Sequence, residues 1–294
     1  MLKQISLLIL CAAAIVWFAT PVQACTSAVV SGKVTPDGRP LLWKNRDTDF
    51  MRNHIDYVKG EKYNFIAVVN SANAYLKEAW MGTNSSGFAL MNTQSYNLVD
   101  VKGDEERGAA NGRVIYRALE VCATVEDFCH FLDTISKPSD IEANFGVIDA
   151  QGGAAMFEVD YHKYVMYDAN NPKDAPYGYI ARTNFSFAGK VNEGAGYVRY
   201  MEADQVLMKA SATGSITPQF IFNDLSRSFR NRMLDIDLRS GAYNRPQASG
   251  WFVDQDFIPR SSTSCSVVVQ GVKPGEKAEL TTMWTLLGLS LIHI

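Results

Sequence analysis

The order of strand-like and helix-like segments is the sequence feature that most constrains how this chain can fold. After residue 25 the segments come in blocks: strands, helices, strands, helices and strands again. The strand-like segments are rich in β-branched and aromatic residues and are separated by Gly, Pro, Asn and Asp. They span residues 26–32, 40–47, 64–71, 87–96, 143–150, 153–160, 163–169, 177–187, 263–271 and 278–287.

Four further segments have helical character, and two of them begin with clear start signals. Thr124 is an N-cap with Glu126 and Asp127 in the following turn, and Thr217 is a cap followed by Pro218 at the first helical position. The helical segments span residues 113–122, 124–135, 197–211 and 217–228. Because helices do not alternate with single strands, the pattern predicts a mainly antiparallel α+β fold with helices layered on sheets.

The first 24 residues are typical of a secretory signal peptide. Lys3 supplies a positive charge, residues 5–20 are nearly all apolar, and Val22 and Ala24 place small residues at positions −3 and −1 of a cleavage site. A short membrane anchor is the alternative, but a span needs about 20 apolar residues. We therefore expect cleavage after Ala24 and a secreted or periplasmic protein.

The last six residues, 289–294, have the sequence that a common sequencing adapter gives when it is translated in one frame. We interpret them as an artefact. The expected organisation is then a signal peptide at residues 1–24 and a single domain at residues 25–288, truncated at its C-terminal end.

Composition excludes several classes of function. The chain is 47% apolar and 20% charged with a net charge of −3, which is typical of a globular protein, and it has no basic cluster for nucleic acid. No internal run is long enough to cross a bilayer, so membrane contact is expected only through the cleaved signal peptide. The four histidines and five cysteines have no metal-ligand spacing, and we expect no metal and no other cofactor.

The cysteines beyond the leader have several interpretations. Cys122, Cys129 and Cys265 are expected to pack as small apolar residues, although disulfides are an alternative in an oxidising compartment. Cleavage after Ala24 would make Cys25 the N-terminal residue, with a thiol and a free α-amine on adjacent carbons. Such an amine has a pKa of about 7.7–8.0 and can accept the thiol proton. A disulfide or a lipid anchor at Cys25 are alternatives, and Gln23 disfavours the lipid anchor.

From Cys25 onward the chain resembles the linear amide C–N hydrolases. These are cysteine N-terminal-nucleophile (Ntn) hydrolases, and they include choloylglycine (bile salt) hydrolases, penicillin V acylases and acyl-CoA:6-aminopenicillanate acyltransferase-like proteins. The resemblance is carried, in order, by "CTSAVVSGKVTPDGRPLLWKNRDTD", "MGTNSSGFALMNTQS", "ANFGVIDAQGGAAMFEVD", "YIARTNFSF" and "IPRSSTS". It implies an αββα sandwich, in which two antiparallel sheets lie between helix layers.

The resemblance also implies roles for four residues. Cys25 matches the nucleophile, Asp47 a residue that hydrogen-bonds to it, Asn184 the donor to the oxyanion, and Arg260 an active-site arginine that lowers the thiol pKa. Each has a structural alternative: Asp47 could be half of a surface pair with Arg46, Asn184 part of a turn, and Arg260 a structural charge.

Other positions stay open in the resemblance. Lys44 stands where bile salt hydrolases have an arginine three residues before the aspartate, and a second register pairs Arg46 with Asp49. A further family asparagine falls on Asn92 or Gln94.

The resemblance predicts an amidohydrolase that cleaves small N-acyl substrates through a thioester on Cys25. Bile salts, penicillin V, acyl-homoserine lactones, N-acyl amino acids and dipeptides are candidate substrates. An acyltransferase or a dipeptidase on the same fold is an alternative, and a lipoprotein binding module acylated at Cys25 is the non-enzyme alternative. The expected partner is a small-molecule amide, with homo-oligomer formation left open.

Overall fold

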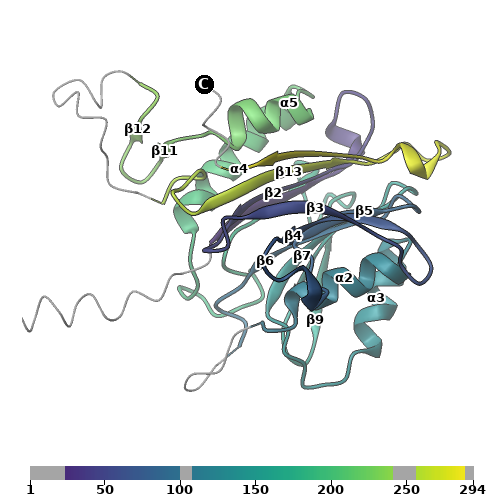
Figure 1. Cartoon of the computed structure of the whole chain (residues 1–294). Helices are drawn as coiled ribbons and strands as arrows, with labels where there is room; N and C mark the ends of the chain where they lie inside the picture. Colours follow the sequence, from purple (N-terminus) through teal and green to yellow (C-terminus); the bar gives the residue numbers. More distant parts are fainter. Residues whose placement is uncertain (1–23, 100–107, 241–255, 289–294) are drawn as a thin grey trace, which may run out of the picture.

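The computed structural model describes residues 24–99, 108–240 and 256–288 (Figure 1). Residues 1–23 of the predicted signal peptide and the adapter-like residues 289–294 lie outside these ranges, so both interpretations stay predictions. Within the described ranges, no helix combines the length and apolar character needed to cross a bilayer.

Seven strands that follow one another in sequence form one antiparallel sheet, in the order β3-β4-β5-β6-β7-β8-β9. The two helices of the first helical block are inserted between β6 and β7. The strands are β3 (Asn53–Val58), β4 (Phe65–Asn70), β5 (Met81–Asn84), β6 (Ala89–Gln94), β7 (Ala143–Ile148), β8 (Ala154–Val159) and β9 (Tyr164–Asp168).

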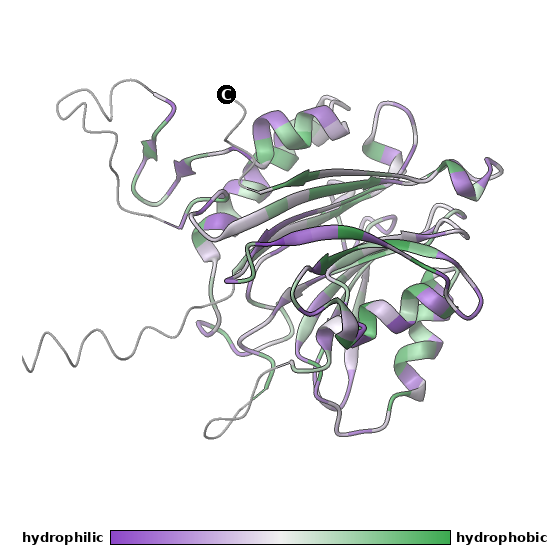
Figure 2. Ribbon diagram, viewed as in Figure 1, coloured by the Kyte–Doolittle hydropathy of each residue, from purple (hydrophilic) through white to green (hydrophobic). Residues whose placement is uncertain are grey.

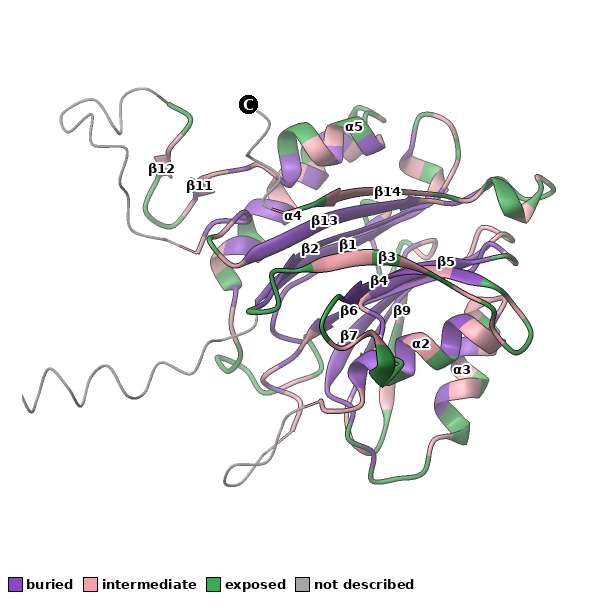
Figure 3. Cartoon of the chain, viewed as in Figure 1, coloured by how far each residue is buried: buried purple, intermediate pink, exposed green. Residues whose placement is uncertain are grey.

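The second sheet has five strands, in the order β10-β1-β2-β13-β14. These strands are β1 (Cys25–Val30), β2 (Leu41–Asp47), β10 (Tyr179–Arg182), β13 (Thr263–Gln270) and β14 (Thr282–Leu287). Central strands β1 and β2 are buried along their whole length, whereas edge strands β3 and β14 are partly exposed (Figure 3). A short ribbon of β11 (Arg230–Asn231) and β12 (Ile236–Asp237) lies outside both sheets.

Helices cover the outer face of each sheet (Figure 1). The seven-stranded sheet packs against α2 (Asn111–Val121) and α3 (Val125–Thr134), and the five-stranded sheet packs against α4 (Tyr197–Ala212) and α5 (Pro218–Phe220). Short 3₁₀ turns are η1 (Gly32–Val34), η2 (Ala74–Leu76) and η4 (Ala278–Leu280), and η3 (Ile221–Leu225) is a π turn. The expected αββα sandwich is confirmed.

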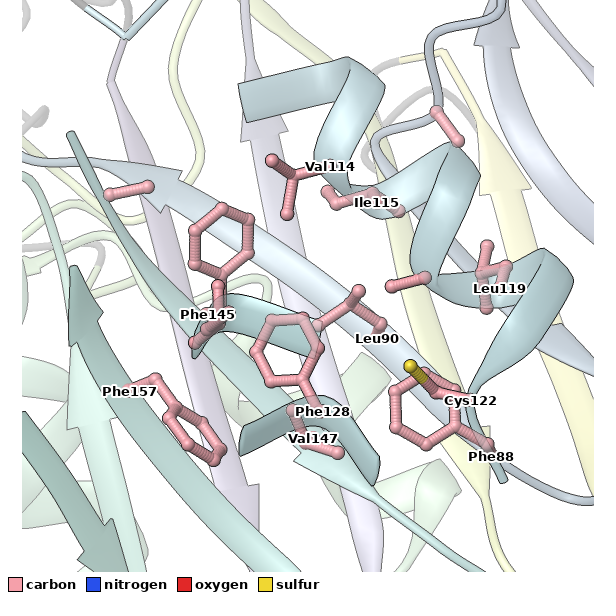
Figure 4. Close-up of a cluster of buried hydrophobic side chains, with 14 of the residues drawn as sticks. Phe88, Leu90, Val114, Ile115, Leu119, Cys122, Phe128, Phe145, Val147 and Phe157 are labelled. Carbon is pink, nitrogen blue, oxygen red and sulfur yellow. The ribbon is translucent and has the colours of Figure 1, made fainter. Parts of the chain in front are cut away.

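Three apolar layers hold the sandwich together, and hydrophobic residues follow the central strands (Figure 2). In the layer under α2 and α3, Phe128 lies among Phe88, Phe145 and Phe157 (Figure 4), and its ring meets that of Phe157 edge-on at 5.0 Å between centroids. Edge-on pairs of this kind add to the stabilisation from burial itself.

The layer between the sheets depends on close contact at Gly146 of β7. A Cβ atom at this position would lie 2.3 Å from Met91 Cε and 2.8 Å from Leu42 Cδ1, which belongs to the opposite sheet. The absence of a side chain therefore lets the sheets approach each other here.

Three sequence expectations need correction. Strands β3 and β5 were not predicted, because "NHIDYV" has no clean alternation and "MGTN" is short and contains a glycine. The helix expected at 217–228 is one α-helical turn, capped by Thr217, that continues as the π turn of residues 221–225. The four cysteines in the described ranges are free, so the disulfide alternative does not hold for them.

Candidate active site

Strand β1 places Cys25 in the wall of a cavity of about 650 Å³. The residue is 7% exposed and lies opposite Arg46 in the β1–β2 register. The same wall holds Lys44 and Asp47 of β2. Central strands of the five-stranded sheet thus bring the predicted nucleophile and its neighbours together.

Asn184, two residues after the end of β10, fixes the backbone nitrogen of Cys25. This N–H donates to Asn184 Oδ1 at 2.9 Å, and Asn184 Nδ2 donates to the carbonyl oxygen of Gln94 at 2.9 Å. The oxygen of the Asn184 amide therefore faces Cys25. The nitrogen of Cys25 is a peptide nitrogen in the unprocessed chain, and cleavage after Ala24 would turn it into the α-amine at this same position.

Arg199 of α4 also contacts this site, and sequence reasoning missed it. Its Nη1 donates to the carbonyl oxygen of Cys25 at 2.5 Å, and its Nη2 donates to Asn184 Oδ1 at 2.9 Å. Its Nε donates to Asp256 at 2.7 Å, and the residue is 1% exposed. The one sequence signal is weak: a cation in the first turn of a helix opposes the helix dipole.

Asp47 is completely enclosed at the end of β2, where the pairing with β13 is irregular between Thr263 and Cys265. Thr263 Oγ1 donates to its Oδ1 at 2.6 Å. Burial raises the pKa of this carboxyl to about 7, although Arg199, Thr263 and Arg260 each lower it. The irregular pairing of β2 with β13 is a β-bulge, and bulges beside active sites commonly redirect a side chain. Asp47 and Arg46 are 1% and 4% exposed, so they are not a surface pair.

Arg260 approaches the site from the loop before β13. It forms an ion pair with Asp256 at 3.3 Å, and its backbone N–H donates to Thr263 Oγ1 at 2.9 Å. Its contacts thus lead to Asp47 through Thr263, while Arg199 holds the backbone of Cys25. Whether Arg260 acts on the thiol stays a prediction.

The two basic residues of β2 have different partners. Lys44 Nζ donates to Asn92 Oδ1 at 2.9 Å and to the Trp80 carbonyl oxygen at 3.2 Å, and burial lowers its pKa to about 8. Arg46 donates to Asn53 Oδ1 and to Asn70 Oδ1, the latter at 2.8 Å, rather than to the exposed Asp49 of the second register.

Both candidates for the further family asparagine reach the cavity from β6. Asn92 accepts the hydrogen bond from Lys44, and Gln94 accepts the one from Asn184 through its backbone oxygen. The structure therefore brings seven of the eight predicted residues together around Cys25. The eighth, Arg260, reaches this group through Thr263. Among the described residues, no group of three or more metal-ligating side chains is present.

The chain has two stacked antiparallel sheets between helix layers, and a cysteine begins a central strand beside a buried aspartate and asparagine. This arrangement defines an Ntn hydrolase of the linear amide C–N hydrolase class. The sequence model described as acyl-coenzyme A:6-aminopenicillanic acid acyl-transferase matches residues 34–212, and the chain belongs to this family. Membership supports amide hydrolysis or acyl transfer in general. The matched region includes Asp47 and Asn184 and begins after Cys25.

Several solved structures align with this chain. An N-acylethanolamine-hydrolyzing acid amidase ortholog from Caenorhabditis elegans aligns with a TM-score of 0.50 and 14% identity, over 89% of this chain and 100% of that one. A mutant conjugated bile acid hydrolase from Clostridium perfringens (TM-score 0.46, 14% identity, 89% and 96% covered) and penicillin V acylase from Agrobacterium tumefaciens (0.42, 16%, 92% and 93%) also align. No curated protein sequence matches. At such low identity the likeness concerns the fold alone.

Proposed function

We propose that this protein is a secreted or periplasmic amidohydrolase that cleaves small N-acyl amides with Cys25 as its N-terminal nucleophile. The observation that carries the proposal is the placement of Cys25. Its nitrogen is fixed 2.9 Å from Asn184 Oδ1, and the residue lines the cavity. Cleavage after Ala24 would leave a free amine at that point, oriented by Asn184 and close to the thiol on the adjacent carbon.

The proposed reaction starts when the α-amine accepts the proton of the Cys25 thiol. The thiolate attacks the amide carbonyl carbon, and the π electrons move to oxygen to give a tetrahedral oxyanion. As this intermediate collapses, the C–N bond breaks and the protonated α-amine gives its proton to the leaving nitrogen. The products of this half-reaction are a free amine and a thioester on Cys25.

Water then attacks the thioester, and the Cys25 amine takes up the proton that water loses. The acid is released and the thiol regenerated. If another amine attacks in place of water, the same site acts as an acyltransferase, which is the alternative that the family description favours.

Neighbouring residues have positioning roles in this reaction. Arg199 holds both the carbonyl oxygen of Cys25 and the amide of Asn184, and so it fixes the nitrogen that exchanges protons. Asp47 lies close enough for its backbone oxygen to be 3.9 Å from Cys25 Sγ. In the folded chain Cys25 is 7% exposed, so a lipid on its sulfur could not reach a membrane from this position.

The test has two parts. Intact mass of the exported protein is expected to show a chain that begins with unmodified Cys25. A panel of N-acyl amides is expected to show hydrolysis by the wild type and none by Cys25→Ala, whereas Cys129→Ala, which changes a cysteine outside the cavity, keeps full activity. Amide cleavage by the Cys25→Ala variant, or a mature chain with residues before Cys25, would overturn the proposal.

A further inference from the structure

Two cations from one strand enter the same cavity beside the nucleophile. Lys44 and Arg46 are two residues apart on β2, so their side chains lie on the same face of the sheet. They are 2% and 4% exposed, and both line the cavity that contains Cys25. Basic side chains are almost never buried to this degree unless they are paired.

Their hydrogen-bond partners carry no formal charge. Among the described residues, Arg46 donates to the side-chain oxygens of Asn53 and Asn70, and Lys44 to the Asn92 side chain and the Trp80 backbone. These bonds orient the cations without neutralising them. An arginine has five N–H donors and a lysine three, so donors are left for a further acceptor.

The acidic side chains of the cavity wall have hydrogen-bond or ion-pair partners of their own, although Asp47 also lies close enough to raise the pKa of both cations. Asp47 accepts from Thr263 and is approached by Arg199 and Arg260, which both lower its pKa. Glu78 forms an ion pair with Arg113 at 3.6 Å. The residues that line the cavity therefore carry an excess of positive charge, and this charge is concentrated next to Cys25.

We propose that Arg46, supported by Lys44, forms an anion subsite that selects substrates with a carboxylate, or a similar anion, close to the scissile amide. The inference rests on the proposed function and specifies its substrate class. Burying a cation is costly unless an anion pairs with it, so the bound substrate would supply the missing partner.

The register sets how far this anion lies from the reacting carbon. Arg46 is directly opposite Cys25 in the β1–β2 pair, and opposite residues have Cβ atoms about 4.5–5.5 Å apart. The anion is thus expected within a few bonds of the scissile carbonyl. An N-acyl α-amino acid satisfies this condition, because three bonds separate its carboxylate carbon from the amide carbon.

The guanidinium is preorganised for a planar anion. Asn53 and Asn70 hold its two terminal nitrogens, and its central carbon lies 4.7 Å from the centroid of the Trp80 ring. Arginine in such a fixed orientation favours bidentate binding of carboxylates.

The experiment compares substrates that differ only in charge. Using the acyl group that the wild type cleaves fastest, kcat/KM is measured for the N-acylglycine and for the N-acylglycinamide. Glutaranilic acid and its methyl ester form a second pair, in which the charge lies on the acyl half. We expect the wild type to prefer the charged member of at least one pair, and the pair that shows the preference identifies the half that carries the anion.

Variants then attribute the preference to Arg46. Arg46→Met is expected to lower the ratio of charged to neutral kcat/KM by roughly 10- to 100-fold, the range of one charge-assisted hydrogen bond. Arg46→Lys should retain part of the ratio. Arg117→Met is the matched control, because Arg117 is a surface residue paired with Glu61 and Glu120, and its ratio should equal that of the wild type.

A wild type with no preference for the charged member of either pair overturns the inference. An equal loss on both members in Arg46→Met does so too, because it would mean that Arg46 serves the nucleophile instead. If Arg46→Met does not fold, Asn70→Ala, which removes one of the amides that hold the guanidinium, gives the same ratio test. A chain with no Cys25-dependent hydrolysis of any amide contradicts the proposed function itself and is distinguishable from these outcomes.

Discussion

Replacing Arg199 with methionine is expected to lower both the stability and the activity of the mature protein. Methionine keeps much of the length and apolar volume of arginine but makes no hydrogen bond. In the structure Arg199 is 1% exposed and donates to Cys25, Thr26, Asn184 and Asp256. The substitution therefore removes a buried cation together with all its bonds.

The magnitude follows from the partners that remain. The Cys25 carbonyl oxygen is buried and loses a charged donor, which costs about 1.5–3 kcal/mol. Asn184 Oδ1 still accepts a hydrogen bond from Cys25, so the free-energy cost of losing the Arg199 donor is smaller there. Asp256 is about one-third exposed, and water replaces much of what it loses. We expect the free energy of unfolding to fall by about 3 kcal/mol, within the range for breaking buried charge interactions.

Urea denaturation of the wild type, Arg199→Met and Arg199→Lys measures this effect. Lysine restores the charge but cannot contact Cys25, Asn184 and Asp256 at once, so it should recover less than half of the loss. Activity per folded molecule should fall about 100-fold in Arg199→Met, in line with a misplaced catalytic group. A change in unfolding free energy below about 0.5 kcal/mol, with full activity, would refute the reasoning, because such values are typical of surface substitutions.

Three further predictions concern titration and packing. Since the pKa of Asp47 is about 7, kcat/KM should fall as pH drops below 7. Between about pH 4 and 7 the folded chain keeps a proton on Asp47 that the unfolded chain releases, so the free energy of unfolding should decrease as pH rises through that range. Urea titrations should show that Asp47→Asn flattens this dependence of stability on pH. Gly146→Val should destabilise the protein by about 1–3 kcal/mol, because its Cβ would lie 2.3 Å from Met91 Cε, and an unchanged melting temperature would contradict the close contact between sheets. Phe128→Ala should cost about 3–5 kcal/mol in unfolding free energy, whereas the exposed Tyr75→Ala should stay near the wild type.

Sequence reasoning was most successful where local patterns carry the information. Blocks of strand-like segments predicted a mainly antiparallel α+β fold, and the family resemblance implied the sandwich. Thr124 and Thr217 marked two helix starts that the structure confirms. Strands β3 and β5 were missed because β3 lies at an edge, where one face needs no apolar side chains, and β5 has only four residues.

Parts of the site escaped prediction because they depend on contacts that are distant in sequence. Arg199 reaches Cys25 across 174 positions, and nothing in a helical segment reveals that one of its charged residues points inward. The sequence analysis considered Arg46 with Asp49, a residue close to it in sequence. The contact of Arg46 with Asn70 forms only when the two sheets pack against each other around one cavity. Only the folded chain shows that Arg46 and Lys44 face the nucleophile.

If the predicted cleavage after Ala24 takes place, the position of this residue would link catalysis to the timing of that cleavage. Ala24 is 1% exposed, and the backbone nitrogen of Cys25 already donates a hydrogen bond to Asn184. A protease needs an accessible segment of chain, so a copy that folds with its leader attached would conceal the very bond that has to be cut. In that copy the nitrogen of Cys25 stays an amide, which cannot accept a proton from the thiol. The leader could then be removed only before the chain folds, and copies that fold with the leader attached would remain inactive.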